Sequence, residues 1–240
     1  ARDISTAQAA ILCGADAVFI GAQAFGARAE AVNSIDEIRT LCQFAHLFNV
    51  KVHATVNILL YDDEISSVQE LIYALAEAGV DALIVQDPVV FTLDIPRGVE
   101  LHASTQCGID TIEKLKFYES LGVTQVVLPR EFTQNQIKAF HEACPNVRLE
   151  CFIAGALCVS VSGICHISEY LKDRSANRGR CAQICRLPMQ LYKNNREIAT
   201  GHLLSLKDND LSSHLETLID CGIRTFKIEG RLKPIDYVAN

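Results

Sequence analysis

The most constraining feature of this sequence is a short unit that recurs along the chain. A glycine near the end of an amphipathic run is followed by a short polar step and then by a β-branched strand. Glycine is the natural residue at a helix C-terminus, because it enters the left-handed conformation without a Cβ clash. The strands that follow are apolar on both faces, which is typical of parallel strands covered by helices. The unit occurs at 13–21, 78–86, 121–129 and 221–230.

Further strands and helices extend this alternation to eight strand candidates. Ser34 followed by Glu37 matches a capping box at the start of one helical run. Alternating helices and strands predict a parallel sheet with right-handed crossovers. Eight units favour a (β/α)8 TIM-like barrel, and no G-x-G-x-x-G motif supports a dinucleotide fold. The remaining strands are predicted at 49–57, 101–105, 146–155 and 202–208, and helices at 35–48, 63–78, 109–121 and 133–143.

The extent of the chain bears on its domain organisation. We expect residues 1–240 to form a single barrel domain, because 240 residues is about the length that such a barrel needs. The sequence starts directly in a helical run, so we expect it to be a piece of a longer protein that lacks a strand ahead of Ala1. Residues 156–188 form a cysteine-rich insertion after the strand at 148–155.

Charge and composition limit the partners and the compartment. The net charge of −7 argues against a nonspecific grip on nucleic acid, which needs clustered Lys and Arg. A local basic strip nevertheless lies within the cysteine-rich stretch. No secretory signal and no run of about 18 apolar residues is present, so we expect a cytoplasmic protein without a membrane partner. Ten cysteines in a reducing compartment are then free or bound to metal. The basic strip consists of Arg174, Arg178, Arg180 and Arg186.

Four cysteines form a C-x6-C-x15-C-x3-C array at Cys158, Cys165, Cys181 and Cys185. Four thiolates from one segment can close around one tetrahedral metal ion or one iron–sulfur cluster. Zinc sites usually place their ligands in pairs two to four residues apart, and the first pair here is separated by six. We therefore favour a 4Fe-4S cluster over zinc, with incidental cysteines as a third interpretation.

Polar residues follow most of the predicted strands, where a barrel carries its chemistry. His102 and Glu150 are candidate proton-transfer groups. Lys227 and Glu229 alternate on one strand face and could point into the same cavity. Each of these residues could instead cap a helix or pair with a neighbour. The candidate substrate-binding residues are Asn57, Gln86, Gln106, Arg174, Arg178, Arg180 and Arg231.

The residues around the first two cysteines match a known signature. The pattern Glu150-x-Phe152-x-x-Gly155-Ala156-Leu157-Cys158, followed by Gly163-x-Cys165, resembles that of peptidase family U32. The resemblance extends through GADAVFIG, LHASTQ, SANRG, CRLP, LLSLKDN and FKIEGR. It implies that the four cysteines of the array bind a 4Fe-4S cluster.

The resemblance also implies an activity. Its RNA-hydroxylating members suggest hydroxylation of a cytidine in 23S ribosomal RNA or its precursor, with prephenate as co-substrate. Arginines of the basic strip could bind RNA phosphates or the carboxylates of such a donor. The resemblance further implies a short N-terminal strand and a large C-terminal region as partners of this portion.

Two other functions remain open. The family name points to a collagenase-like peptidase, although the sequence contains neither a G-x-S-x-G elbow nor an H-E-x-x-H helix. A Cys–His nucleophilic pair could still form in space. The third possibility is a cluster-bearing scaffold or sensor without turnover.

Overall fold

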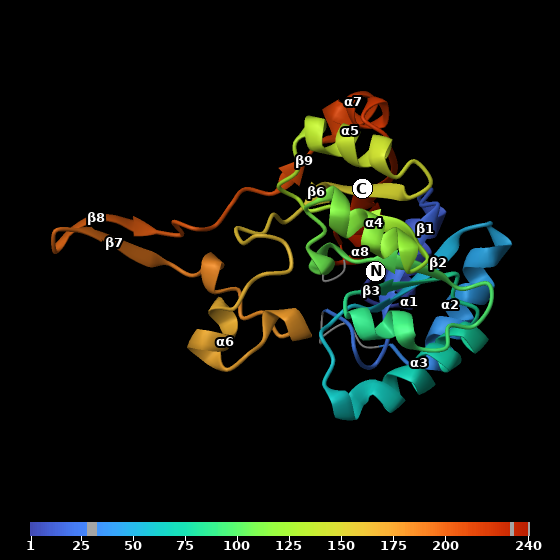
Figure 1. Ribbon diagram of the computed structural model, residues 1–240. Helices are drawn as coiled ribbons and strands as arrows, with labels where there is room; N and C mark the ends of the chain where they lie inside the picture. Colours follow the sequence, from blue (N-terminus) through green and yellow to red (C-terminus); the bar gives the residue numbers. More distant parts are fainter. Residues whose placement is uncertain (28–32, 231–232, 240) are drawn as a thin grey trace.

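A curled parallel sheet forms the centre of the molecule (Figure 1). The computed structural model describes residues 1–27, 33–230 and 233–239. Each neighbouring pair along the path is parallel, as the alternating pattern predicts. The strands follow the order β1 (Ala17–Gly21), β2 (Lys51–Val56), β3 (Ala82–Val85), β4 (Glu100–Ala103), β5 (Val123–Val127), β6 (Arg148–Gly155) and β10 (Ile223–Ile228).

Helices connect these strands and cover the outer face of the sheet. The four predicted helical runs are confirmed, and Ser34 and Glu37 form the expected capping box. The repeating glycines Gly14, Gly79, Gly122 and Gly222 all have positive φ, which explains their place between helix and strand. The helices are α1 (Ile4–Leu12), α2 (Ile35–Leu47), α3 (Ile65–Ala78), α4 (Ile112–Ser120), α5 (Gln134–Ala143), α7 (Leu215–Asp220) and α8 (Ile235–Ala239).

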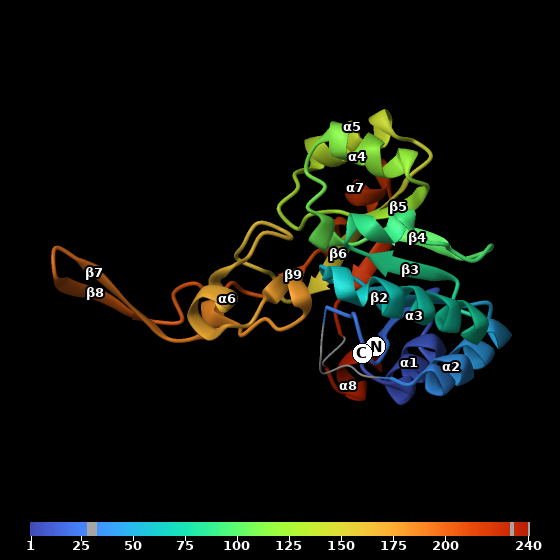
Figure 2. The same cartoon turned by 60° about the horizontal axis from the view of Figure 1, so that its bottom comes forward.

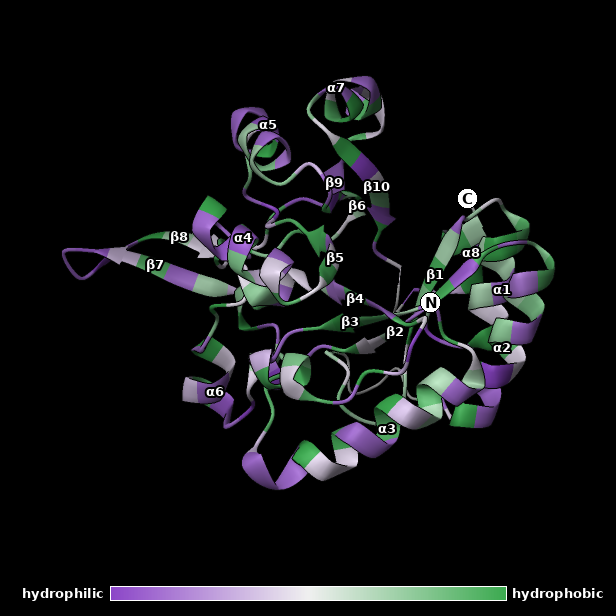
Figure 3. Ribbon diagram, turned by 45° about the vertical axis from the view of Figure 1, so that its right-hand side comes forward, coloured by the Kyte–Doolittle hydropathy of each residue, from purple (hydrophilic) through white to green (hydrophobic). Residues whose placement is uncertain are grey.

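The apolar core lies between the helices and the sheet, in two clusters. One gathers around Ile38, Leu75 and Leu83 under α1 to α3, and the other around Leu115 and Leu149 under α4, α5 and α7. Figure 3 shows hydrophobic and hydrophilic residues alternating along α2 and α3, as expected for helices with one face on the sheet. We call the sheet with these helices the half-barrel.

The chain forms a half-barrel, and one predicted strand is corrected. In the part of the chain that the structure describes, β1 and β10 are the edges of the sheet and are not paired, so the barrel is not closed. The prediction of a strand at 202–208 is wrong. The edge of β6 that this strand would have paired with is occupied by β10. The leucines within residues 202–208 are exposed instead. The stretch is followed directly by the short strand β9 (Asn209–Asp210), which pairs antiparallel with the end of β6.

The stretch between β6 and β9 extends beyond the sheet and its covering helices. The cysteine segment, residues 156–188, contains the short helix α6 (Ile167–Lys172). The hairpin arm, β7 (Met189–Lys193) and β8 (Arg196–Gly201), was not predicted. Figures 1 and 2 both show this arm projecting away from the half-barrel beyond α6. The 3-10 helices are η1 (Asp62–Glu64), η2 (Pro88–Thr92), η3 (Thr105–Cys107), η4 (Ala176–Arg178), η5 (Ile184–Arg186) and η6 (Ser212–His214).

None of the helices in the described ranges is both long enough and apolar enough to cross a membrane.

Candidate functional site

A cavity of about 1000 Å³ lies at the carboxyl ends of the strands, beneath the cysteine segment. Its floor is made by inward-facing strand residues, which alternate with core residues because successive side chains of a strand point to opposite faces. Its roof is almost entirely the cysteine segment. The floor residues include Phe19, Thr55, Ile84, Val127, Phe152 and Lys227.

The cysteine segment is attached to loops that follow several different strands. Arg178 donates to both carboxylate oxygens of Glu64, at 2.9 and 2.6 Å, after β2. Ser162 donates through its backbone and its hydroxyl to the Glu131 carboxylate after β5, both at 2.9 Å. The Leu59 amide donates to the Asn177 carbonyl at 3.1 Å. These contacts hold the segment across the mouth of the half-barrel.

Two glycines bring the segment against the backbone of the half-barrel. A Cβ on Gly163 would collide with the Gln106 carbonyl oxygen after β4, and one on Gly179 would lie 2.6 Å from the Gly26 carbonyl oxygen after β1. Both residues have positive φ, at 77° and 76°. Glycine is therefore required at both positions for steric and conformational reasons.

The four cysteines of the array line this one cavity and form no disulfide. The Gln183 amide donates to the Cys181 sulfur at 3.4 Å, the type of hydrogen bond that thiolate ligands of iron–sulfur clusters accept. Burial raises the pKa of Cys185, and the nearby Cys158 and Cys181 thiols raise it further.

This donor set fits a group ligated by four sulfurs. The thiols are not, however, gathered into ligating geometry: among the residues that the structure describes, no three His, Cys, Asp or Glu side chains form a metal-ligand set.

A buried ion pair lies under the cavity floor. The Lys227 ammonium is 2.7 Å from the Glu150 carboxylate, and the two side chains are only 9% and 4% exposed. Lys227 also lies 4.4 Å from the Phe19 ring centroid. Burial alone would raise the pKa of Glu150, but the Lys227 charge and hydrogen bonds from Lys227 and Gln125 hold it below its ordinary value. Glu150 is therefore ionised at neutral pH, and Lys227 presents its charge to the cavity.

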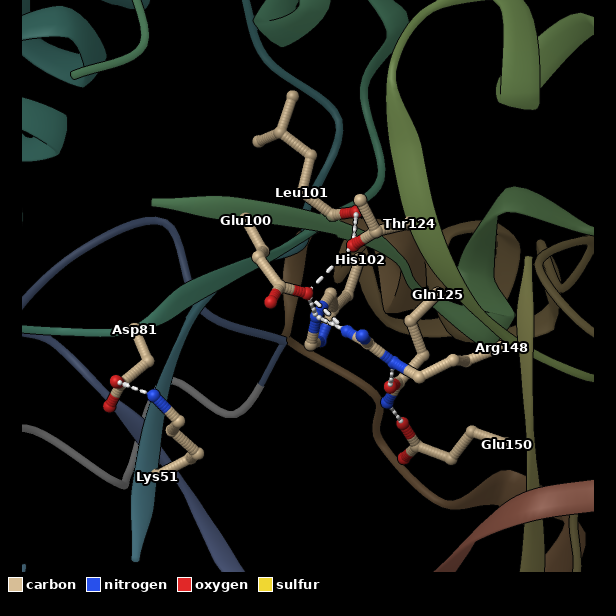
Figure 4. A network of polar contacts seen from close by, with 9 residues as sticks. All are labelled: Lys51, Asp81, Glu100, Leu101, His102, Thr124, Gln125, Arg148 and Glu150. Carbon is tan, nitrogen blue, oxygen red and sulfur yellow. Dashed lines mark hydrogen bonds and ion pairs between the residues drawn. The ribbon is translucent and has the colours of Figure 1, made fainter. Parts of the chain in front are cut away.

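A polar network continues below this pair toward the other end of the half-barrel (Figure 4). Arg148 donates to the Gln125 side-chain oxygen at 2.9 Å and to the Glu100 carboxylate. The Glu100 carboxylate lies 3.2 Å from Nε2 of His102. Gln125 in turn donates to Glu150. The chain of contacts links the half-exposed Glu100 and Arg148 to the cavity floor.

Two histidines pack against each other inside this network. The rings of His53 and His102 meet edge to face, with centroids 4.7 Å apart. Burial and the neighbouring His102 lower the pKa of His53 to about 4, and burial lowers the pKa of His102 despite its contact with Glu100. Nδ1 of His102 is buried without a hydrogen-bond partner. Both rings are thus neutral at physiological pH.

The structure brings some of the predicted site residues together and separates others. Arg231 lies outside the described residues. Glu150 and His102 lie beneath the cavity, whereas Gln86 and Arg178 do not line it. The predicted residues that do line it are Asn57, Gln106, Arg174, Arg180, Lys227 and Glu229, with the four cysteines.

Several predicted side chains have partners that explain them structurally. Asn57 accepts from the Ala27 amide at 3.0 Å and donates to the Ser104 hydroxyl at 3.2 Å, which ties the loop after β1 to β4. Arg174 donates to the carbonyls of Arg180 and Cys181 within the cysteine segment. Arg178 is held by Glu64 and by the Tyr61 ring, 4.0 Å away.

The structure also places in the site several residues to which the sequence analysis assigned no role. Arg130 pairs with Glu229 at 2.9 Å and lies 3.9 Å above the Phe152 ring. Gln125, Arg148 and His53 complete the interior network. A signal for them existed, since polar residues two apart, as at 53 and 55 or 148 and 150, mark an inward face that is not purely apolar.

The family model of Peptidase family U32 matches residues 2–240, which is nearly the whole chain. The chain belongs to this family. U32 membership agrees with the architecture, since the solved structure of the U32 peptidase Mk0906 superposes with a TM-score of 0.56 at 15% identity, covering 92% of this chain and 87% of that one.

The curated relatives of this chain include proteins named for RNA modification. The chain is 52% identical to the 23S rRNA 5-hydroxycytidine C2501 synthase of Escherichia coli (strain K12), covering 100% of this chain and 37% of that protein. It is 34% identical to tRNA hydroxylation protein P1 of Bacillus subtilis (strain 168), covering 100% of this chain and 59% of that protein. The chain therefore spans less than two thirds of the length of each of these relatives.

Proposed function

We propose that this chain is the catalytic portion of an iron–sulfur-dependent hydroxylase that modifies a cytidine in 23S ribosomal RNA, with a prephenate-type co-substrate. The 52% identity to the 5-hydroxycytidine synthase over the full chain supports the reaction and the RNA. The single structural observation that carries the proposal is that all four array cysteines line one cavity above Lys227.

The cysteines have the role of cofactor ligands in this proposal. Cys158, Cys165, Cys181 and Cys185 would hold a 4Fe-4S cluster, which supplies electron transfer when bound. Cys158 and Cys181 are exposed, so a cluster held by these residues would be accessible to solvent.

The floor of the cavity supplies a fixed positive charge. Lys227 is kept in place by Glu150 and by the aromatic rings of Phe19 and Phe152. Its ammonium would bind a carboxylate of the co-substrate, and Arg130 beside Glu229 would orient it. His102 is a neutral base below the floor, and Glu150 an ionised one.

The proposal keeps the (β/α)8 barrel as the complete scaffold. Lys227 of β10 contacts Phe19 of β1 across the unpaired edges of the sheet, and α8 packs against α1. A further strand between these two edges would complete the barrel.

The peptidase alternative rests on the family name and on the relationship to Mk0906. His166 beside Cys165 is the histidine that lines the described cavity, and its ring lies 3.7 Å from Glu169. No cysteine among the described residues shares a hydrogen bond with a histidine, which a nucleophilic pair would need. This favours the hydroxylase.

The test combines a cofactor measurement with a modification assay. Protein purified without oxygen is assayed for iron and acid-labile sulfide, and a deletion strain is complemented with wild type, Cys158→Ser or the control Cys13→Ser, an exposed cysteine outside the array. We expect about four iron and four sulfide per chain, and restoration of one hydroxylated cytidine by wild type and control alone. Stoichiometric zinc without sulfide, or cleavage of a protein substrate by the cluster-free protein, would overturn the proposal.

A further inference from the structure

The hairpin arm has two faces of different character. In its register Lys193 lies opposite Arg196, Tyr192 opposite Glu197, Leu191 opposite Ala199 and Gln190 opposite Thr200. Residues opposite each other share a face, so the pairs alternate between the two sides of the ribbon. Ile198 is the extra residue of a bulge and keeps this alternation in phase.

One face satisfies its own polar groups. Gln190 donates to Glu197 at 3.3 Å, Thr200 donates to Glu197, and the Tyr192 hydroxyl donates to Gln190 at 3.3 Å. These side chains form a closed set that includes the one carboxylate of the arm. The polar side chains of this face are therefore hydrogen-bonded to one another without a binding partner.

The opposite face, which we call the cationic face, is different. It begins at Met189, which lines the cavity, continues through Leu191 and Ala199, and ends at Lys193 and Arg196. Neither cation has an ion-pair partner among the described residues, and both are exposed. Like charges directly opposite each other on a ribbon are destabilising. The arm thus holds two unneutralised cations at its tip, on the face that leads to the site.

The tip itself is conformationally defined. Asn194 and Asn195 both have positive φ, 49° and 59°, as a two-residue type I′ turn requires. Asparagine tolerates this conformation better than most residues. The turn fixes Lys193 and Arg196 on the same side of the ribbon, so their separation is set by the strands.

We propose that the hairpin arm is an RNA-binding arm whose tip cations, Lys193 and Arg196, contact the phosphate backbone of RNA on its way to the cavity. The inference rests on the proposed function. RNA is favoured over a protein partner because the cationic face carries two positive charges and no carboxylate. The arm would position the nucleic acid, while the cavity selects the base.

The test measures the salt dependence of RNA binding by the intact protein. A labelled 23S ribosomal RNA transcript is titrated with wild type and with Lys193→Ala/Arg196→Ala in filter-binding assays at several KCl concentrations. Two lost phosphate contacts should lower the slope of log Kd against log salt by about 1.4 to 1.8 and weaken binding about tenfold or more at low salt. Lys193→Glu/Arg196→Glu should weaken it further.

Two matched variants control for charge and for the ribbon. Lys116→Ala/Lys138→Ala removes two exposed cations from α4 and α5, and Gln190→Ala/Thr200→Ala alters the self-satisfied face of the same arm. Both should leave the slope unchanged. Iron content and cytidine hydroxylation are measured on every variant, as independent readouts of folding and of the proposed function.

The outcomes separate the two proposals. Wild-type binding with an unchanged slope in the tip variants would overturn the arm inference and leave the hydroxylase proposal standing. A reduced slope in a protein that hydroxylates no cytidine would support the arm and overturn the hydroxylase. Wild-type protein that binds no RNA would overturn both.

Discussion

The half-barrel and the cysteine segment differ in what holds them in place. The half-barrel buries two large apolar clusters between its sheet and helices. Across residues 156–208, by contrast, Ile184 is the one hydrophobic residue that is buried, whereas Val161, Tyr170 and Leu171 are exposed. Apolar burial is the main source of folding free energy, so the half-barrel can stabilise itself and the cysteine segment cannot.

The difference assigns separate tasks to the two regions. The cysteine segment depends on polar contacts to the half-barrel and, in the proposed function, on a bound group that joins its four cysteines. Metal binding supplies folding free energy in such segments. The half-barrel contributes a rigid floor whose charges are fixed by a buried network.

The largest expected effect follows from removing the proposed cluster. Chelation of iron under anaerobic conditions should leave the half-barrel folded but expose residues 156–208 to protease. Limited proteolysis with mass spectrometry would locate the cuts, and far-ultraviolet circular dichroism would report the half-barrel. Equal protease resistance with and without iron would contradict the distinction between the two regions.

Within the half-barrel, the Glu150–Lys227 pair should be the most sensitive polar feature. Glu150→Leu leaves the Lys227 charge buried without its partner and should lower the free energy of unfolding by about 3–5 kcal/mol. Urea denaturation measures this. The double variant Glu150→Leu/Lys227→Met should lose much less, because no charge remains buried. Equal losses in both would show that packing, not charge, causes the effect.

A smaller effect is expected where the two regions meet. Arg178→Ala removes the two hydrogen bonds to Glu64 and should lower the local opening free energy of the cysteine segment by about 1 kcal/mol, because both side chains are partly exposed. Hydrogen exchange of amides in residues 156–188 measures it. The unfolding of the half-barrel should not change, and Lys172→Ala, on the exposed surface of α6, serves as the control.

Acid should produce the smallest change. Burial raises the pKa of Glu100, but hydrogen bonds from Arg148, His102 and Thr124 hold it at about 2, below its ordinary 4.5. The folded-state pKa is depressed, so this stabilisation is complete above pH 4.5 and is lost as the pH falls toward 2. Urea midpoints between pH 6 and 3 should decline less steeply in Glu100→Gln. An identical decline in both proteins would show that Glu100 does not contribute to the loss of stability in acid.

The sequence predicted the half-barrel better than the site. Periodicity and glycine position mark each helix-to-strand step, because they arise from local geometry and burial. The hairpin arm was not predicted because its strands are exposed and mix polar and apolar residues without a buried face. The strand predicted at 202–208 failed because its partner edge on β6 is taken by β10, a long-range fact that no local pattern carries.

Site residues were predicted in proportion to their chemical distinctiveness. The cysteine spacing predicts that the four thiols bind one group; all four line one cavity, but among the described residues they do not form a metal-ligand set. Arg178 looked like a binding residue because it lies in a basic strip, yet its partner Glu64 is 114 residues away in sequence. Gln125 and Arg148 were missed because each is ordinary alone and significant only beside Glu150.

The contacts at Gly163 and Gly179 have a consequence for how this family can diversify. Both join backbone to backbone, so they specify no side-chain chemistry on either side. A segment of different length between the two junctions is therefore compatible with the same barrel mouth, provided that glycine remains at both and that the attachments to Glu64 and Glu131 are kept or replaced. The half-barrel is in this sense the constant part of the structure, and the segment that spans its mouth is the part that can vary.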